Sequence, residues 1–172
     1  MLLRPNYAMA FYNLGIVYEK LDRPNEAIAA DKQAIIFKLD YAEAHYNLGL
    51  FYDKLNRSGE AIEAYNQAIK IKPNYAKAYL GLGVVYIKLG RGADAIDAFR
   101  QAIRIEPGYA EAHNNLGIAF GRLGRWPQAI DACKQAVRIR PDYAEAHYNL
   151  GDAYLAIGDK NAAQTELRHG IL

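Results

Sequence analysis

The sequence predicts an all-α solenoid of about five helix–turn–helix units, and three observations support this fold class. The dipeptide Leu-Gly recurs every 34 residues without insertion or deletion, beginning at Leu14, Leu48, Leu82, Leu116 and Leu150. The ten residues 40–49 return unchanged at 142–151. Each unit also contains two segments with the i, i+3, i+4, i+7 spacing of an amphipathic helix. A fixed period of this length indicates stacked copies of one supersecondary unit.

Each unit is numbered here from Ala8 and its equivalents, so that a first helix (helix A) and a second helix (helix B) can be followed along the chain. Positions 4, 7, 8 and 11 give helix A one apolar face, and positions 20, 21, 24, 27 and 28 do the same for helix B. Position 15, between the helices, holds residue types that tolerate a left-handed backbone and end a helix. These residues are Asp22, Asn56, Gly90, Gly124 and Gly158. Proline at position 32, present as Pro73, Pro107 and Pro141, then ends helix B.

These positions predict full units over 8–41, 42–75, 76–109 and 110–143, and a truncated fifth unit over 144–172. Residues 1–7 align with the end of a unit, so we expect them to be the tail of a preceding helix B. A single hairpin cannot bury both of its apolar faces, and each unit therefore depends on its neighbours within one array. Incomplete ends would expose apolar faces, which leaves end-to-end stacking of chains open as a structural role.

The pattern resembles the tetratricopeptide repeat (TPR) family over essentially the whole chain. The family's signature is Trp-x-x-Leu-Gly-x-x-Tyr, followed by Ala-x-x-x-Phe and then Pro. Phe11, Tyr79 or a histidine takes the tryptophan slot here, and Phe99 fills the phenylalanine slot of the third unit. The resemblance implies a right-handed α-solenoid, a superhelix that serves as a protein-interaction scaffold. It also implies that a peptide segment of a partner protein binds in a concave groove lined by helix A.

Composition excludes several classes of partner. The net charge is +2, with 21 basic and 19 acidic residues well mixed, so neither nucleic acid nor an acidic lipid surface is expected as an obligate partner. The longest apolar run is too short to span a bilayer, and we expect no membrane insertion. The single Cys133 excludes a disulfide framework and favours a reducing, cytoplasmic location.

No set of residues has the pattern of a catalytic or metal site. His45, His113 and His147 occupy position 4 of different units, so we expect them to pack rather than to share one metal ion. Cys133 and Asp31 fall at position 24, a core position, where a thiol packs well and an aspartate is costly unless it is paired. We therefore expect no enzymatic activity, no catalytic residue, no cofactor and no metal.

A second stripe of helix A, at positions 2, 5, 6, 9, 12 and 13, lies opposite the core face and predicts a peptide-binding groove. Its asparagines at position 6 can donate to and accept from a peptide backbone, and its aromatic and aliphatic residues can supply apolar contacts. The predicted groove residues are Tyr12, Asn13, Ile16, Tyr46, Asn47, Leu50, Val84, Asn114, Asn115, Ile118, Tyr148 and Asn149. The alternative is that the asparagines and tyrosines only bridge adjacent A helices.

Two further features adjoin this stripe. Lys20, Lys54, Lys88 and Arg122 form a basic column at position 13. They either interact favourably with the dipole at the C-terminal end of helix A or steer an acidic ligand along the groove edge. Trp126 lies in a predicted inter-helix turn, where we interpret it as a packing residue.

The asparagine column also resembles the TPR superhelix of the O-linked N-acetylglucosamine transferases. That resemblance implies a second function, in which this array selects substrates for a larger enzyme such as a protein O-glycosyltransferase.

Overall fold

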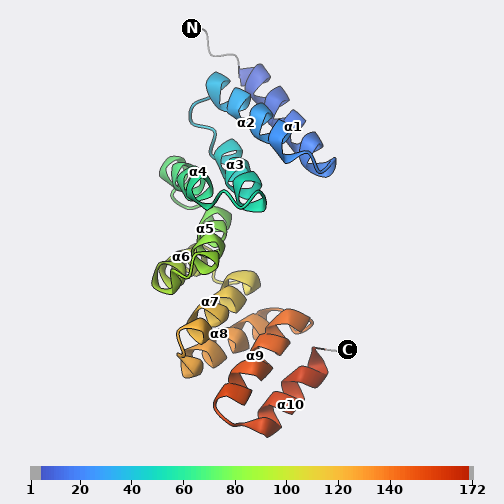
Figure 1. The fold of residues 1–172 in the computed structure, drawn as a ribbon, viewed down its shortest axis with the longest axis vertical. Helices are drawn as coiled ribbons and strands as arrows, with labels where there is room; N and C mark the ends of the chain where they lie inside the picture. The colour runs from blue at the N-terminus through green and yellow to red at the C-terminus, as the bar shows by residue number, and fades with distance from the viewer. Residues whose placement is uncertain (1–4, 171–172) are drawn as a thin grey trace. The chain divides into compact units, whose positions relative to one another are not determined.

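The computed structural model describes residues 5–170, and within that range it contains ten α-helices and no strand (Figure 1). The helices that begin each hairpin are α1 (Pro5–Lys20), α3 (Ala42–Lys54), α5 (Ala76–Lys88), α7 (Ala110–Arg122) and α9 (Ala144–Ala156). The helices that complete them are α2 (Pro24–Phe37), α4 (Ser58–Ile71), α6 (Gly92–Ile105), α8 (Trp126–Ile139) and α10 (Lys160–His169). The odd-numbered helices are the predicted A helices and the even-numbered ones the B helices, so the all-α repeat fold is confirmed.

The chain divides into two compact units, residues 1–85 and 86–172. In the first unit, α2 packs against both α1 and α3, and α3 packs against α4. In the second unit, α7 contacts α6, α8 and α9, while α9 also contacts α8 and α10. Figure 1 shows α1 with α2, and α9 with α10, as antiparallel pairs joined by short turns.

The boundaries of the helices follow the repeat closely in the middle of the chain. The helices α3, α5, α7 and α9 all begin at position 1, and α4, α6 and α8 all run from position 17 to position 30. At the amino-terminal end, α1 begins before position 1, and residues 5–7 of the predicted tail form its first turn. The remainder of that predicted tail, residues 1–4, lies outside the described residues, as do residues 171–172 of the fifth unit.

The turn inside every hairpin uses a left-handed residue at position 15. The φ angles are 55° at Asp22, 57° at Asn56, 70° at Gly90, 68° at Gly124 and 85° at Gly158. In each of the five hairpins the next residue donates its backbone N–H to the carbonyl at position 11, as Arg57 does to Tyr52 at 2.8 Å. The predicted role of position 15 is therefore confirmed in all five units.

Small residues bring the helices together. The alanines at position 20 are buried in all five hairpins, and so are the alanines at position 27 from Ala34 to Ala136. Gly117, at position 8, packs so closely on Cys133 that a Cβ would overlap the Cys133 Sγ. Gly49, at the same position, leaves no room for a Cβ beside the Tyr65 ring. Among the described residues, no helix is long and apolar enough to cross a membrane.

Candidate ligand-binding surface

Within residues 5–85, the aromatic residues of the predicted groove form ring contacts between successive hairpins. The Tyr12 ring centroid lies 5.0 Å from that of Tyr41, and the Tyr46 centroid lies 5.1 Å from that of Tyr75. Tyr46 is also 5.9 Å from Tyr65 in the core. Tyr12 and Tyr46 remain half-buried, so part of each residue stays exposed.

The groove asparagines of α1 and α3 differ in accessibility. Asn13 is exposed, whereas Asn47 is only 7% exposed. Burial raises the pKa of Tyr12 and of Asp31, and the Asn47 amide opposes both shifts. Asn47 therefore faces the preceding hairpin. Ile16 and Leu50, one turn further along their helices, are half-buried, and so is Val84.

In the second compact half of the chain, Asn114 of α7 is wholly buried and connects two A helices. Its Nδ2 donates to Glu145 Oε1 at 3.2 Å, and its Oδ1 accepts from Asn149 Nδ2 at 2.9 Å. This bridge matches the alternative interpretation of the asparagine stripe, so we leave Asn114 out of the proposed ligand contacts. Asn115, Ile118 and Asn149 are half-buried, and Tyr148 is 61% exposed.

A groove of about 230 Å³ lies among α7, α8 and α9, and we call it the Trp126 notch. Its apolar lining includes Ile118, Trp126 and Ala153, and its polar lining comes from Arg122, Asn149 and Asp152, with Gly117, Gly121 and Ala129 completing it. We predicted that Trp126 lies in the inter-helix turn, but it is the first residue of α8. The notch therefore combines an aromatic wall with polar groups at one place on the helix-A surface.

Gly121 is the reason the notch is open. A Cβ at Gly121 would lie 3.1 Å from the Trp126 ring, and a longer side chain would fill the space. The other units carry Glu19, Asp53, Ile87 and Leu155 at this position. The combination of a glycine at position 12 with a tryptophan five residues later was visible in the sequence, but we did not connect the two.

The basic column lies in the last turns of the A helices, and Lys54 and Arg122 make contacts between hairpins. Lys54 forms an ion pair with Asp22, which lowers the pKa of that carboxyl group. Arg122 Nη1 donates to the Ile87 carbonyl at 2.9 Å. Lys20, Lys54, Lys88 and Arg122 are all exposed, so they also contribute positive potential at the helix ends.

A second repeated contact involves cations that the sequence analysis did not single out. At position 16 an arginine lies over the ring at position 11, with the guanidinium carbon 4.5–5.1 Å from the ring centroid. The pairs are Arg23 with Tyr18, Arg57 with Tyr52, Arg91 with Tyr86 and Arg125 with Phe120. The constant five-residue spacing was the available signal.

Asp31 occupies the core as its repeat position predicts. It is 0% exposed, and neither carboxylate oxygen makes a hydrogen bond with the described residues. Burial raises the pKa of Asp31 to about 8, and the nearby Asn47 offsets this only partly. This raised pKa favours the neutral form of Asp31 in the core between α1 and α2.

Cys133 and the position-4 histidines are also placed as core or near-core residues. Burial raises the pKa of the Cys133 thiol to about 12, so the predicted core thiol is confirmed. The Nε2 atoms of His113 and His147 lie 3.0 Å and 2.9 Å from the carbonyls of Pro107 and Pro141, at position 32 of the preceding unit. His147 additionally approaches Glu166 and His169, a cluster that we did not predict.

Comparisons with known proteins agree with this architecture. Sequence models described as tetratricopeptide repeat match residues 8–35, 80–144 and 122–172, and one described as TPR repeat matches residues 52–90. No curated protein sequence matches the chain.

Several solved structures share the fold. A structure of MamA is 25% identical, covers 91% of this chain and 92% of its own, and has a TM-score of 0.83. A MamA structure from Desulfovibrio magneticus RS-1 is 20% identical, covers 99% of this chain and 96% of its own, and has a TM-score of 0.88. YrrB, described as a TPR protein with an unusual peptide-binding site, is 21% identical, with 95% and 84% covered and a TM-score of 0.77.

The described helices thus define a repeat protein built from helical hairpins, and within each compact unit neighbouring hairpins pack against one another, as α2 does on α3 and α8 on α9. The family models cover four stretches of this array, which together span most of the chain. The chain belongs to the tetratricopeptide repeat family.

Proposed function

We propose that this chain is a non-enzymatic protein-interaction module that binds a peptide segment of a partner protein on the surface of its A helices. The Trp126 notch carries this proposal. It is a concave, largely apolar site with a few polar groups at its edge, which is the usual character of a pocket for a ligand side chain. A volume of about 230 Å³ suits one or two side chains rather than a whole small molecule.

The residues around the notch fit a peptide in two respects. Trp126 and Ile118 offer an aromatic and an aliphatic wall of the kind that dominates binding energy at interfaces. Asn149 uses one N–H in its bond to Asn114, and an amide has a second N–H and a carbonyl with which to meet a peptide backbone. Tyr148, adjacent in sequence and exposed, extends the surface with a large amphipathic ring.

The helices α1 and α3 supply a second candidate contact region of similar composition. Tyr12 and Ile16 in α1 lie on the same helix face as Asn13, and Tyr46 and Leu50 in α3 repeat the pattern one unit later. YrrB, which shares the fold, is described as having an unusual peptide-binding site, so proteins of this fold can bind peptides. The residues of this chain that would do so are those just named.

The experiment that tests the proposal is a selection of peptides from a random display library on the 172-residue chain. Selected peptides are then titrated against Gly121→Leu, in which the notch is filled. A leucine is native at this position in α9, as Leu155, so the helix tolerates it. The matched control is Leu155→Ala, which changes the same repeat position outside the notch.

We expect selected peptides to bind Gly121→Leu at least about tenfold more weakly than the native chain and to bind Leu155→Ala unchanged. Circular dichroism of both variants confirms that the helices persist. A library that yields no binder, or binders that ignore the filled notch, would contradict the proposed site.

A further inference from the structure

The last described hairpin departs from the other four at several positions on helix B, and two of these positions lie near His147. Position 23 is alanine in the first four units, as Ala30, Ala64, Ala98 and Ala132, and is Glu166 in the fifth. Position 26 is glutamine in the first four, as Gln33, Gln67, Gln101 and Gln135, and is His169 in the fifth. Both departures replace a side chain that cannot bind a metal well with one that can.

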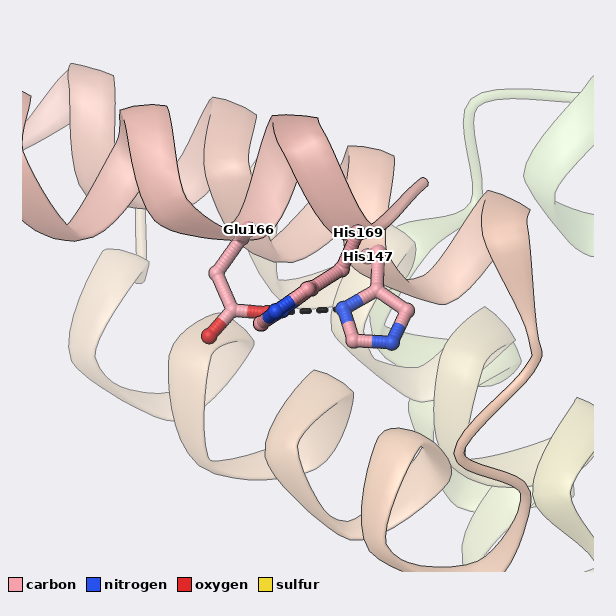
Figure 2. A group of neighbouring side chains, drawn as sticks. All are labelled: His147, Glu166 and His169. Carbon is pink, nitrogen blue, oxygen red and sulfur yellow. Dashed lines mark hydrogen bonds and ion pairs between the residues drawn. The ribbon is translucent and has the colours of Figure 1, made fainter. Parts of the chain in front are cut away.

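Both new side chains point toward His147 of α9, as Figure 2 shows. His147 Nδ1 lies 2.7 Å from Glu166 Oε2, and one ligand atom from each of the three residues lies within 4.8 Å of the others. The rings of His147 and His169 meet edge to face, with centroids 5.4 Å apart. Three potential ligands from two helices therefore converge on one point.

The second ring nitrogen of His147 determines which atom faces the cluster. A carbonyl can only accept, so Nε2 carries a hydrogen and donates it to the Pro141 carbonyl at 2.9 Å. In the neutral ring Nδ1 then presents its lone pair to the Glu166 carboxylate. Two acceptors this close require a positive charge between them, either a proton or a metal ion. A metal-binding histidine characteristically donates its other N–H to a carbonyl or carboxylate in this way.

We propose that His147, Glu166 and His169 bind a divalent transition-metal ion, with zinc as the ion that best suits the ligands. Two imidazole nitrogens and one carboxylate oxygen form a known zinc ligand set, which leaves a fourth position for water or another ligand. Zinc takes these ligands at about 2.0–2.2 Å, so the three atoms must draw somewhat closer together. His169 is exposed and Glu166 is partly so, and both side chains can rotate, while the buried His147 stays fixed.

This site is separate from the Trp126 notch and does not depend on peptide binding. A bound ion would clamp α9 to α10 and would replace the ion pair between His147 and Glu166. The neighbouring hairpin provides an internal comparison. His113 makes the same bond to a position-32 carbonyl but has Ala132 and Gln135 at the positions of Glu166 and His169.

The test is isothermal titration of zinc chloride into the untagged 172-residue chain, followed by cobalt chloride titration read by visible absorption. The variants are Glu166→Ala and His169→Gln, which install the residues of the other units, and the control is His113→Gln. We expect the native chain to bind one zinc ion saturably and cobalt to give the absorption bands of a tetrahedral site. Each of the two variants should weaken the affinity at least about tenfold, and His113→Gln should leave it unchanged.

The absence of saturable zinc binding by the native chain would overturn the proposal and leave His147 and Glu166 as a structural ion pair. Equal affinity in the native chain, Glu166→Ala and His169→Gln would also overturn it, because the ion would then lie elsewhere. Thermal unfolding with and without zinc separates a loss of zinc binding from a loss of stability in a variant. The rise in Tm produced by zinc should be present in His113→Gln and lost in His169→Gln.

Discussion

Gly81 in α5 lies directly against the ring of Tyr65 in α4, so that a Cβ added to Gly81 would be 2.5 Å from Tyr65 Cζ. Tyr65 is among the largest wholly buried side chains of the described residues. Gly81 occupies position 6, where the other four units carry asparagine. The asparagine stripe is therefore interrupted because this unit needs the space for a core tyrosine.

This contact predicts that Gly81→Ala destabilises the chain even though alanine favours helix. Overpacking against a rigid ring costs about 1–3 kcal/mol, which exceeds the helix-propensity gain of roughly 0.5–1 kcal/mol. The measurement is the midpoint of urea unfolding followed by circular dichroism. The matched control is Gly59→Ala in α4, where an added Cβ meets nothing within 4 Å and should raise the midpoint. A midpoint that rises in both variants would show that Tyr65 does not need the space.

Asp31 predicts a stability that depends on pH. Its pKa is raised from 3.8 to about 8 in the folded chain, so the folded chain holds a proton that the unfolded chain has lost between those values. The stabilisation from neutral Asp31 is therefore fully present below pH 3.8 and is lost as the pH rises through about 8.

Asp31→Asn mimics the protonated carboxyl group and should remove this dependence. We expect the variant to exceed the native chain in stability by on the order of 2–4 kcal/mol at pH 9, with a much smaller difference at pH 4. Thermal unfolding of both proteins across that range measures the difference, and the comparison cancels the titration of other groups. Parallel pH profiles would rule out a neutral buried Asp31.

Asn114 and Asn115 are adjacent in sequence, but the structure gives them different roles. Asn114→Ala removes a buried amide and leaves Glu145 and Asn149 without their partner, which should cost about 1–3 kcal/mol in unfolding free energy. Asn115→Ala, at a half-buried position, should change stability by less than about 0.5 kcal/mol. Urea unfolding of the two variants checks this. Equal losses would mean that the bridge from α7 to α9 contributes little.

Cys133 should be unreactive in the folded chain. Its thiol is buried and its pKa is raised to about 12, so almost no thiolate forms near neutral pH. A chromogenic disulfide reagent at pH 8 should label it at least about a hundredfold more slowly in buffer than in 6 M guanidinium chloride, on the order expected from the thiolate fraction. Rapid labelling of the native chain would place the thiol outside the core.

The repeat made most of the fold predictable from the sequence. The left-handed residues from Asp22 to Gly158, the buried alanines of helix B and the core position of Cys133 follow from a single period, because each unit repeats the same local physics. The outermost positions were less predictable. Pro5 begins α1, and proline is well suited to the first position of a helix.

The candidate site was predictable only in part, because accessibility depends on how neighbouring units pack. The sequence placed Asn47, Asn114 and Asn149 on one stripe, but it could not show that Asn114 is buried beneath Asn149. The cluster of His147, Glu166 and His169 required knowing that positions 23 and 26 of helix B reach position 4 of helix A. The departures of the fifth unit from the repeat at these two positions were the signal.

The fluorescence of Trp126 tests the central claim most directly, because this residue is the only tryptophan in the 172-residue chain and lines the proposed site. A peptide selected on the native chain is titrated while the tryptophan emission is recorded. We predict a saturable change in emission wavelength or intensity whose midpoint equals the Kd from calorimetry, and its loss in Gly121→Leu. Calorimetric binding without any change in Trp126 emission would contradict the account, since the peptide would then occupy a different surface.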